Sequence, residues 1–342
     1  MVSKKRFALV GAGLFGEMHA KVYSNHAGVE LAAVCDLDEP RARQVAEQYG
    51  AGRACRDWRD IAADDTIDAA SIATPDFAHT EAAVGLAEAG KHLLVEKPLA
   101  MTVEDCEQII AAAKKNTVKL MVDFHNRWSP PFHEAHCFIA GGGLGSPRYA
   151  YLRLSNTTFV PTKMLSWASK SSVLWFLGSH AIDAACWLIG EWPNRVYSVS
   201  RREVLRGRGV DTPDLFASTL EFPGGAVATI ENVWLLPDAA PNIVDMKCEL
   251  IGTKAAIYID TTSNRTLAIQ DESRVRHVDV LGGPVVHGKQ LGFASESIRH
   301  FADCVVQDQE PLVPGEVGLE VTRICKAIER SVETGQPVEM HR

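Results

Sequence analysis

Three glycines near the start of the chain constrain its fold more than any other feature. A short apolar run, residues 7–10, ends at Gly11, and Gly13 and Gly16 follow at the spacing GxGxxG. A helical pattern of apolar residues begins at once, over residues 14–22. The motif predicts a strand, a tight turn and a helix: Gly11 permits the turn, Gly13 lets the backbone approach a pyrophosphate, and Gly16 lets helix and strand pack closely. The N-terminus of such a helix also attracts phosphate.

An acidic residue at the end of the next strand strengthens the dinucleotide interpretation. The apolar run over residues 31–35 ends in Asp36, twenty residues beyond Gly16. An acid at this distance binds the ribose hydroxyls on the adenine side of a dinucleotide. Leu14 and Phe15, inside the turn, are expected to contact the same cofactor. The competing interpretation is a glycine turn in another kind of α/β protein, with Asp36 merely starting a loop.

The residues around Asp36 favour NAD over NADP. A carboxylate that binds the ribose diol would repel a 2′-phosphate. Leu37 follows where an enzyme that binds this phosphate would be expected to carry Arg or Ser.

Length and composition bound the remaining possibilities. The chain has 342 residues, 46% of them hydrophobic and 23% charged, which is typical of a globular protein with two domains. Its net charge of −8 and the lack of a basic cluster beyond residues 4–6 argue against nucleic acid as a partner. No apolar run approaches the length of a membrane span, and the basic start leads directly into a strand, so we expect a cytoplasmic protein without a membrane partner. The eight cysteines are scattered singly, which predicts small buried residues and no metal site.

Strand and helix patterns alternate over the first third of the chain. Further strands are expected over residues 67–73, 92–95 and 118–124, with helices between them. The alternation predicts a doubly wound parallel sheet of the Rossmann type, with ligands bound beyond the carboxyl ends of the strands. Polar motifs follow three of these ends: Thr74-Pro75, Glu96-Lys97-Pro98 and His125-Asn126-Arg127.

On these motifs the chain resembles the Gfo/Idh/MocA family of nicotinamide-dependent sugar and inositol dehydrogenases. The resemblance covers nearly the full length and includes the later segment from Gly178 to Asp183. It implies that Lys97 lies beside the nicotinamide and the reacting hydroxyl, and that the Lys97–Pro98 bond is cis. It also implies cofactor contacts from Thr74, Pro75, His79, Glu96 and Lys97.

Physical chemistry supports a catalytic Lys97 independently of the resemblance. A lysine beside an apolar ring is partly desolvated, which lowers its pKa and lets it polarise a substrate oxygen or transfer a proton. The alternative is a surface lysine after an edge strand.

Beyond Arg127 the pattern changes. We place the domain boundary just before this point, with a Rossmann domain over residues 1–123 and a substrate-binding and oligomerisation domain over 124–342. A helix is expected over 130–140. Strands are then expected over 148–158, 197–205, 215–222, 227–235, 244–251 and 256–260, with one or two more over 266–279. Runs of strands joined by turns indicate a mostly antiparallel sheet. The resemblance implies an open sheet with helices on one face and a subunit interface on the other, in a homodimer or homotetramer.

A helix over residues 179–189 interrupts these strands and carries His180 and Asp183, three residues apart on neighbouring positions. Ser179 is its expected cap. The resemblance implies that His180 is the acid/base for the substrate hydroxyl and that Asp183 binds further hydroxyls; a histidine's ordinary pKa suits this task. The chain departs from many family members at Phe176, where they carry an Asp four residues before the histidine. Asp183 or another acid takes that role, or the substrate differs, or Lys97 and His180 act alone.

Four further residues are candidates for the substrate site. Lys163 and Trp167 lie in a polar segment over residues 156–172 that predicts a lid or binding loop, although Trp167 also fits a small satellite core. Asn126 and Arg127 match a family segment near the nicotinamide. The helices expected over 293–307 and 317–333 are interpreted as structural.

Taken together, residues and resemblance predict an NAD-dependent enzyme that oxidises a secondary hydroxyl of a sugar, sugar derivative or cyclitol by reversible hydride transfer. Two rival functions follow from the same family. One is a glycoside hydrolase that retains its NAD, and the other is a dinucleotide-binding sensor without catalysis.

Overall fold

The protein divides into two units, and the chain passes between them more than once. The computed structural model describes residues 4–262, 267–270, 272, 275–277 and 280–340. The first unit contains residues 1–128 and 282–322, and the second contains 129–281 and 323–342. The expected boundary near residue 123 lies close to the first crossing. The return of residues 282–322 to the first unit is a feature that the sequence pattern did not indicate.

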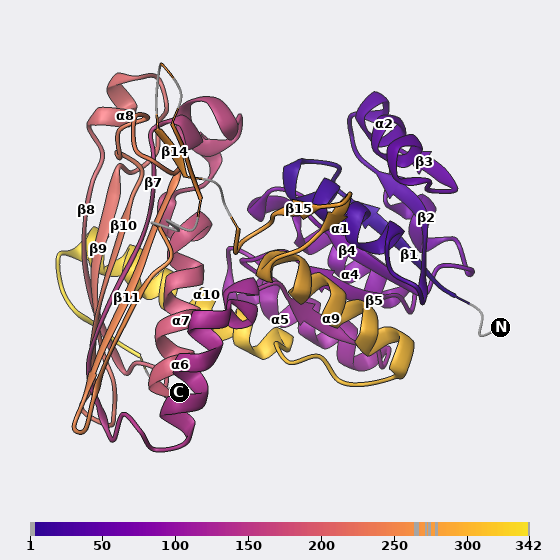
Figure 1. Ribbon diagram of the computed structural model, residues 1–342. Coiled ribbons are helices and arrows are strands. Elements are labelled where there is room, and N and C mark those ends of the chain that lie inside the picture. Colours follow the sequence, from indigo (N-terminus) through magenta and orange to yellow (C-terminus); the bar gives the residue numbers. More distant parts are fainter. Residues whose placement is uncertain (1–3, 263–266, 271, 273–274, 278–279, 341–342) are drawn as a thin grey trace. The chain divides into compact units, whose positions relative to one another are not determined.

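The first unit is built on a parallel sheet of six strands in the order β3-β2-β1-β4-β5-β6 (Figure 1). The strands are β1 (Lys5–Val10), β2 (Val29–Cys35), β3 (Arg53–Cys55), β4 (Ala69–Ile72), β5 (His92–Val95) and β6 (Leu120–Val122). The order reverses beside β1, between β2 and β4, which is where ligands bind in sheets of this kind. The predicted Rossmann-type sheet is confirmed.

Helices connect these strands as the alternating pattern predicted. They are α1 (Leu14–Ser24), α2 (Glu39–Tyr49), α3 (Arg59–Ala62), α4 (Thr80–Glu88) and α5 (Val103–Lys115), with short 3₁₀ turns η1 (Asp76–Ala78) and η2 (His125–Trp128). The caps fit the sequence: Asp38 accepts a hydrogen bond from the N–H of Arg41 at the start of α2, and Thr102 accepts one from Asp105 at the start of α5.

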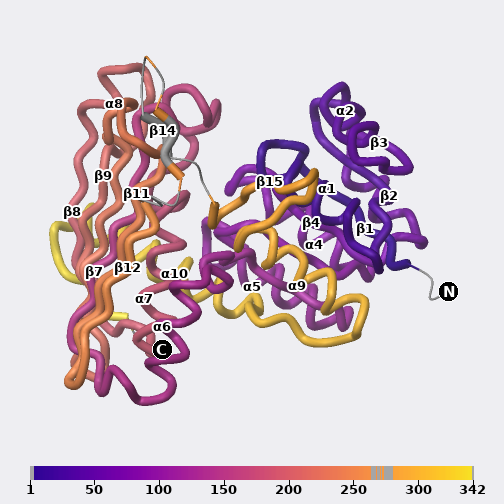
Figure 2. The backbone as a smooth tube through the Cα atoms, viewed as in Figure 1, coloured from indigo at the N-terminus to yellow at the C-terminus, as the bar shows by residue number. Residues whose placement is uncertain are grey.

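The returning segment completes the core of the first unit. It contributes the hairpin β15 (Val285–Val286) and β16 (Lys289–Gln290), helix α9 (Phe293–Gln307) and the beginning of α10 (Gly315–Thr334). Figure 2 shows α9 running among the elements of the N-terminal part of the chain. Phe301 of α9 packs edge-on against Phe7 of β1, with ring centroids 5.9 Å apart, and both side chains are fully buried. This apolar contact explains why the segment returns.

The second unit is built on a seven-stranded sheet in the order β12-β11-β7-β10-β9-β8-β17. The strands are β7 (Pro147–Asn156), β8 (Arg195–Arg201), β9 (Leu215–Glu221), β10 (Val227–Val233), β11 (Val244–Gly252), β12 (Ala256–Asp260) and β17 (Val338–Glu339). Strands β7 and β10 pair in parallel and the other neighbours pair antiparallel, so the predicted mostly antiparallel sheet is confirmed. A small ribbon, β13 (Ala268–Gln270) and β14 (Val275–His277), lies within the range expected for further strands, whose end residues Thr266 and Asp279 are outside the described residues.

One face of this sheet is covered by helices, as Figure 1 shows for α6 (Pro130–Ala140) and α7 (Ser179–Ile189). The ring of His136 on α6 stacks on Trp187 of α7, with centroids 4.2 Å apart. The remaining local elements are the short helix α8 (Val204–Gly207), the 3₁₀ turn η4 (Ala168–Lys170) and the π-helical turns η3 (Val160–Met164) and η5 (Leu174–Gly178).

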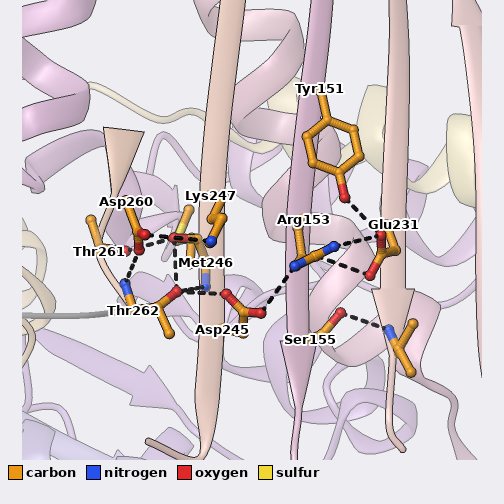
Figure 3. A network of polar contacts seen from close by, with 11 residues as sticks. Tyr151, Arg153, Ser155, Glu231, Asp245, Met246, Lys247, Asp260, Thr261 and Thr262 are labelled. Atoms are coloured by element: carbon orange, nitrogen blue, oxygen red, sulfur yellow. Dashed lines mark hydrogen bonds and ion pairs between the residues drawn. The ribbon is translucent and has the colours of Figure 1, made fainter. Parts of the chain in front are cut away.

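The opposite face carries a polar network across the four strands β10, β7, β11 and β12 (Figure 3). Along β7, alternate residues are buried, and the half-buried residues between them point away from the helices. Arg153 of β7 pairs with Glu231 of β10 at 3.0 Å and with Asp245 of β11 at 3.4 Å. Tyr151 donates a hydrogen bond to Glu231 over 2.7 Å. This face is therefore charged and aromatic where the helical face is apolar.

Two local predictions, a hairpin turn and a helix cap, have opposite outcomes. The hairpin between β9 and β10 is confirmed: Phe222 donates to the carbonyl of Ala226, and Gly225 has a positive φ of 81°. The prediction that Ser179 caps α7 is wrong, because the π-helical turn η5 leads directly into α7 and the Ser179 hydroxyl donates to the carbonyl of Trp175.

Seven of the eight cysteines are buried, as expected, and Cys137 is the exposed exception. Within the part of the chain that the structure describes, no helix combines the length and apolar character needed to cross a membrane.

Candidate functional site

The glycine turn after β1 has the geometry that its sequence predicted. Gly11 has a φ of 94°, and a Cβ there would lie 2.6 Å from the carbonyl oxygen of Ala73. A Cβ on Gly16 would lie only 1.8 Å from the carbonyl oxygen of Gly11. Both positions therefore exclude a side chain: Gly11 because the backbone after β4 lies against it, and Gly16 because α1 begins directly against the turn.

Gly13 differs from these two glycines, since a Cβ there would meet no atom within 4 Å among the described residues. Gly13 directly precedes α1, so the space beside it adjoins the unpaired N–H groups of that helix. The Leu14 side chain, 64% exposed, borders the same turn, and Phe15 is half-buried. No nearby atom among the described residues requires a glycine at this position. A glycine of this kind at a helix N-terminus fits a binding site for a pyrophosphate.

Asp36, directly after β2, lies against this turn. Its Oδ2 accepts a hydrogen bond from the N–H of Ala12 over 2.6 Å, and its Oδ1 accepts one from Asp38 over 2.9 Å. Each carboxylate oxygen has a second lone pair available for a ribose hydroxyl. Arg41 of α2 donates from Nε to the carbonyl of Ala12. The neighbouring Leu37 is 82% exposed and offers no charge to a phosphate.

Two motifs at neighbouring strand ends are joined by His79. Its Nδ1 lies 2.8 Å from the carbonyl oxygen of Pro98, and its Nε2 lies 2.9 Å from that of Thr74. His79 is 1% exposed, so its ring links the Thr74-Pro75 loop to the segment after β5. Both ring nitrogens face backbone carbonyls, and the contact between His79 and a cofactor stays a prediction.

Lys97 lies at the same edge of the sheet, directly after Glu96 at the end of β5. The Lys97–Pro98 peptide bond is cis, as predicted. The Lys97 side chain is buried, with 7% of the residue exposed. Burial lowers the pKa of its amine, and the negative charges of Glu96 and Asp76 oppose that shift. A lysine in this state can exchange a proton nearer neutral pH than an exposed one can.

Glu96 points inward and meets residues that the sequence analysis did not single out. Its Oε1 lies 3.1 Å from Nε2 of His19 on α1, and the same nitrogen lies 3.9 Å from Oδ2 of Asp123. One ring nitrogen or carboxylate oxygen of each of these three residues lies within 4.8 Å of the other two. We call His19, Glu96 and Asp123 the acid–histidine group. Sequence spacing does not reveal this group, because His19 lies on α1 and the two acids directly follow β5 and β6, far apart in the chain.

The electrostatics of this group are decided by burial and by its internal contacts. Burial and the charge of Glu96 raise the pKa of the Asp123 carboxyl well above its ordinary value. Burial alone would also raise the pKa of Glu96, but the hydrogen bond and charge of His19 outweigh it and lower that pKa to about 2. The ionised form is thus favoured at Glu96, and the protonated form is favoured at Asp123.

The segment after β6 places Asn126 and Arg127 in the 3₁₀ turn η2. Asn126 is buried at 5% exposure and Arg127 is half-buried. Burial lowers the pKa of the neighbouring His125 to about 4, so its ring is neutral at physiological pH. Asn126 thus lies in the same loop as an uncharged imidazole, at the carboxyl end of β6.

In the second unit, α7 buries both of its predicted functional residues. His180 is 5% exposed and Asp183 is 1% exposed, in the first two turns of the helix. The π-helical turn η5 precedes them, and a Cβ on its last residue, Gly178, would lie 2.9 Å from Oδ1 of Asn232 on β10. Close packing against the sheet therefore sets where α7 begins.

Phe176, the departure from the family pattern, lies in an aromatic cluster of the second unit. Its ring centroid is 5.9 Å from that of Trp234 and 6.1 Å from that of Trp167. Phe176 is 9% exposed and Trp234 is fully buried, whereas Trp167 is half-buried. Lys163, on the turn η3, is exposed. Trp167 thus packs on a small core, and part of its surface stays accessible.

An NAD-type Rossmann sheet followed by a second α/β unit defines the class of the protein, and comparison with known proteins agrees. Residues 5–124 match the model described as "Oxidoreductase family, NAD-binding Rossmann fold", and residues 138–340 match "Oxidoreductase family, C-terminal alpha/beta domain". The chain belongs to the Gfo/Idh/MocA family of oxidoreductases.

Several members of this family are similar over the whole length. The chain is 25% identical to myo-inositol 2-dehydrogenase of Thermotoga maritima, with 98% of each protein covered. It is 27% identical to scyllo-inositol 2-dehydrogenase (NAD(+)) of Bacillus subtilis, with 99% of this chain and 97% of that protein covered. The structure of scyllo-inositol dehydrogenase from Lactobacillus casei with NAD(H) and scyllo-inositol aligns with a TM-score of 0.83, at 17% identity over 98% of this chain and 99% of that one.

Proposed function

We propose that this oxidoreductase is an NAD-dependent dehydrogenase that oxidises a secondary hydroxyl of a sugar, sugar derivative or cyclitol. The observation that carries the proposal is Lys97, a buried lysine with a lowered pKa at the sheet edge that also bears the glycine turn and Asp36. The printed names of full-length relatives, which are inositol dehydrogenases, support the substrate class.

The residues of the first unit fit an NAD cofactor. The open space beside Gly13 accommodates the pyrophosphate, and the Asp36 carboxylate accepts hydrogen bonds from the ribose diol. The same carboxylate repels a 2′-phosphate, and the exposed Leu37 provides nothing to bind one, so NAD is preferred to NADP. When bound, the nicotinamide supplies the acceptor for the substrate hydride.

The chain's own residues handle the hydroxyl proton. Lys97, in its neutral form, accepts the proton or polarises the oxygen, and His180 is the second acid/base. Asp183 binds further hydroxyls of the substrate. Phe176 packs among aromatic rings and cannot accept a hydrogen bond, so the acid that many family members carry there has no direct replacement at this position. This difference favours a substrate with a less polar group at that place than inositol or glucose.

The test is NADH formation from NAD at mildly alkaline pH across a panel of aldoses, sugar acids, nucleotide sugars and inositols. Turnover of one compound, reduced at least about a hundredfold in Lys97→Ala, is the expected result. A control, Lys254→Ala, changes a lysine in the turn between β11 and β12 of the second unit and should leave turnover unchanged. Silence across the panel, with NAD still bound, would reject the dehydrogenase and favour redox-assisted glycoside hydrolysis or ligand sensing.

We also propose that the helix-free face of the second unit binds another copy of the chain, giving a homodimer or homotetramer. Tyr149, Tyr197 and Tyr258 are exposed on strands of that sheet, beside the partly buried network of Arg153. Aromatic and arginine side chains on an otherwise half-buried sheet face are typical of protein interfaces. Sedimentation equilibrium should show a dimer or tetramer that Tyr258→Asp weakens; a monomeric wild-type protein would contradict the proposal.

A further inference from the structure

The proposed reaction does not explain which members of the acid–histidine group are charged. Glu96 and Asp123 are 6% and 1% exposed, and His19 is completely buried. Two carboxyl groups this close, away from water, cannot both be ionised without strong repulsion. Oδ1 of Asp123 has no hydrogen-bond partner among the described residues, which is tolerable for a neutral acid and costly for an anion. The protonated form is therefore the favoured one at Asp123.

His19 is held so that one ring nitrogen faces Glu96. Its Nδ1 lies 3.0 Å from the Ser71 hydroxyl on β4, and that hydroxyl also contacts the Tyr23 hydroxyl. With Nδ1 engaged, Nε2 is the nitrogen that faces Oε1 of Glu96 at 3.1 Å. A hydrogen bond donated to a buried carboxylate stabilises its ionised form.

We propose that His19 is a positioning residue that keeps Glu96 ionised, so that the Glu96 carboxylate sets the protonation of the adjacent Lys97. This inference rests on the proposed function only for its kinetic consequence. The proposed reaction assigns chemistry to Lys97 and none to α1, whereas the contact between His19 and Glu96 links α1 to the residue directly before Lys97. His19 does not touch the reacting atoms and acts through Glu96.

The charged and titratable groups near Lys97 and Glu96 come from several elements of the first unit. They are Glu96 after β5, Asp76 in η1, Asp123 after β6, His125 in η2, and His19 with Tyr23 on α1. His125 is neutral, so the charges that offset the burial of the lysine come from Glu96, Asp76 and, to the extent that it ionises, Asp123. Glu96 is the largest of these influences. Loss of its charge should thus lower the pKa of Lys97 further.

The sharpest test measures Lys97 itself, without substrate. Competitive labelling with dilute acetic anhydride over a pH series, read by mass spectrometry of the Lys97 peptide, gives the pH at which the amine is half-protonated. His19→Leu removes the donor, Glu96 then takes up a proton, and the midpoint should fall by about one pH unit or more. His19→Gln keeps an N–H donor at nearly the same reach and should restore the wild-type midpoint.

Three further variants make the result decisive. Glu96→Gln should lower the midpoint as His19→Leu does, and it carries the test if His19→Leu does not fold. Asp123→Asn removes an acid whose charged form is disfavoured, so it should lower the midpoint less than Glu96→Gln does. His92→Leu is the matched control, because His92 begins the same strand and accepts a hydrogen bond from the N–H of Lys119, at the other end of β5. It should lower thermal stability without moving the midpoint.

The kinetic readout separates this inference from the proposed function. If a substrate is found, the pH at which kcat/KM is half-maximal should shift to lower pH in His19→Leu by the same amount as the labelling midpoint. A shifted midpoint with no turnover of any substrate would reject the dehydrogenase and leave the inference standing. A folded His19→Leu or Glu96→Gln protein with an unchanged midpoint would overturn the inference, as would one equivalent of divalent metal in the wild-type protein that His19→Leu loses.

Discussion

The carboxylate of Asp36 accepts a hydrogen bond from the backbone N–H of Ala12 over 2.6 Å, which ties the end of β2 to the glycine turn after β1. One side chain thereby shapes the turn and presents its remaining lone pairs to a ribose. The same carboxylate also accepts a hydrogen bond from the N–H of Asp38. Its loss should affect both the local backbone and the choice of cofactor.

We expect Asp36→Ala to weaken NAD binding about tenfold or more, because it removes charge-assisted hydrogen bonds to the ribose and to the turn. The preference for NAD over NADP should fall as well, since the repulsion of a 2′-phosphate is lost. Isothermal titration with each dinucleotide measures both effects. Asp38→Ala is the control: it removes the cap of α2, costs about 1 kcal/mol of stability and should leave cofactor preference unchanged. Equal weakening of NAD and NADP by Asp36→Ala would contradict the assignment.

Gly13 and Gly16 should respond to alanine in opposite ways. Gly13→Ala meets no protein atom within 4 Å, so thermal stability should be retained while NAD affinity falls about tenfold or more as the methyl group enters the pyrophosphate space. Gly16→Ala places a Cβ 1.8 Å from the Gly11 carbonyl and should destabilise the fold itself. Differential scanning fluorimetry with and without NAD separates the two effects. Gly207→Ala, equally open but at the end of α8, should change neither.

Stability below neutral pH should depend on Asp214, which is 1% exposed in the second unit. Its carboxylate accepts hydrogen bonds from the N–H groups of Glu203, Val204 and Leu205 over 2.7, 2.9 and 2.8 Å. Burial opposes the charge, but these donors hold the pKa of Asp214 below its ordinary value. A depressed pKa means that the stabilisation is present above the ordinary aspartate range, near pH 4, and is lost as the pH falls through the folded-state value.

Asp214→Asn should therefore lower the free energy of unfolding by about 2 kcal/mol at pH 7, because an amide offers one acceptor atom in place of two. The difference from wild type should shrink as the pH falls below about 4 towards the depressed folded-state pKa, because protonation then increasingly favours the unfolded chain, whose carboxyl has the ordinary pKa. Urea unfolding of both proteins over a pH series measures it. A difference that stays constant down to pH 3 would show that the charge of Asp214 does not contribute.

Phe176 should contribute mainly through packing. Phe176→Ala removes a ring that lies against Trp234 and Trp167 and should lower the free energy of unfolding by about 3 kcal/mol. Phe176→Leu keeps most of the volume and should cost less than half as much. Urea unfolding monitored by tryptophan fluorescence gives both values. If Phe176→Ala is as stable as wild type yet binds substrate differently, the ring faces the substrate and not the core.

Several site residues were predictable from sequence because their roles depend on local backbone. The glycine turn needs only the conformations of a few consecutive residues, so the positive φ of Gly11 and the tight contact at Gly16 follow from the motif. The alternation of strands and helices likewise predicted which residues end at one edge of the sheet, including Asp36 and Lys97. The cis Lys97–Pro98 bond followed from the family resemblance.

Other residues escaped sequence analysis because their roles depend on partners distant in the chain. Ser179 was expected to cap a helix, but a π-helical turn precedes it, a backbone choice enforced by packing of Gly178 on Asn232. The two carbonyls that engage the His79 ring come from different loops, and no local spacing predicts that pairing. The stripe of apolar residues on α9 is visible in the sequence, but not its destination against Phe7.

The sequence by itself determined that this chain carries a dinucleotide-binding turn, a parallel sheet and a lysine at a strand end, because these follow from local spacing and alternation. Only the tertiary structure decided that Lys97 is buried next to Glu96, and that His19 and Asp123 lie close to the Glu96 carboxylate. The ends of two strands and a helix must meet before these groups come within a few ångströms, and Coulombic interaction and desolvation depend on that separation and not on sequence spacing.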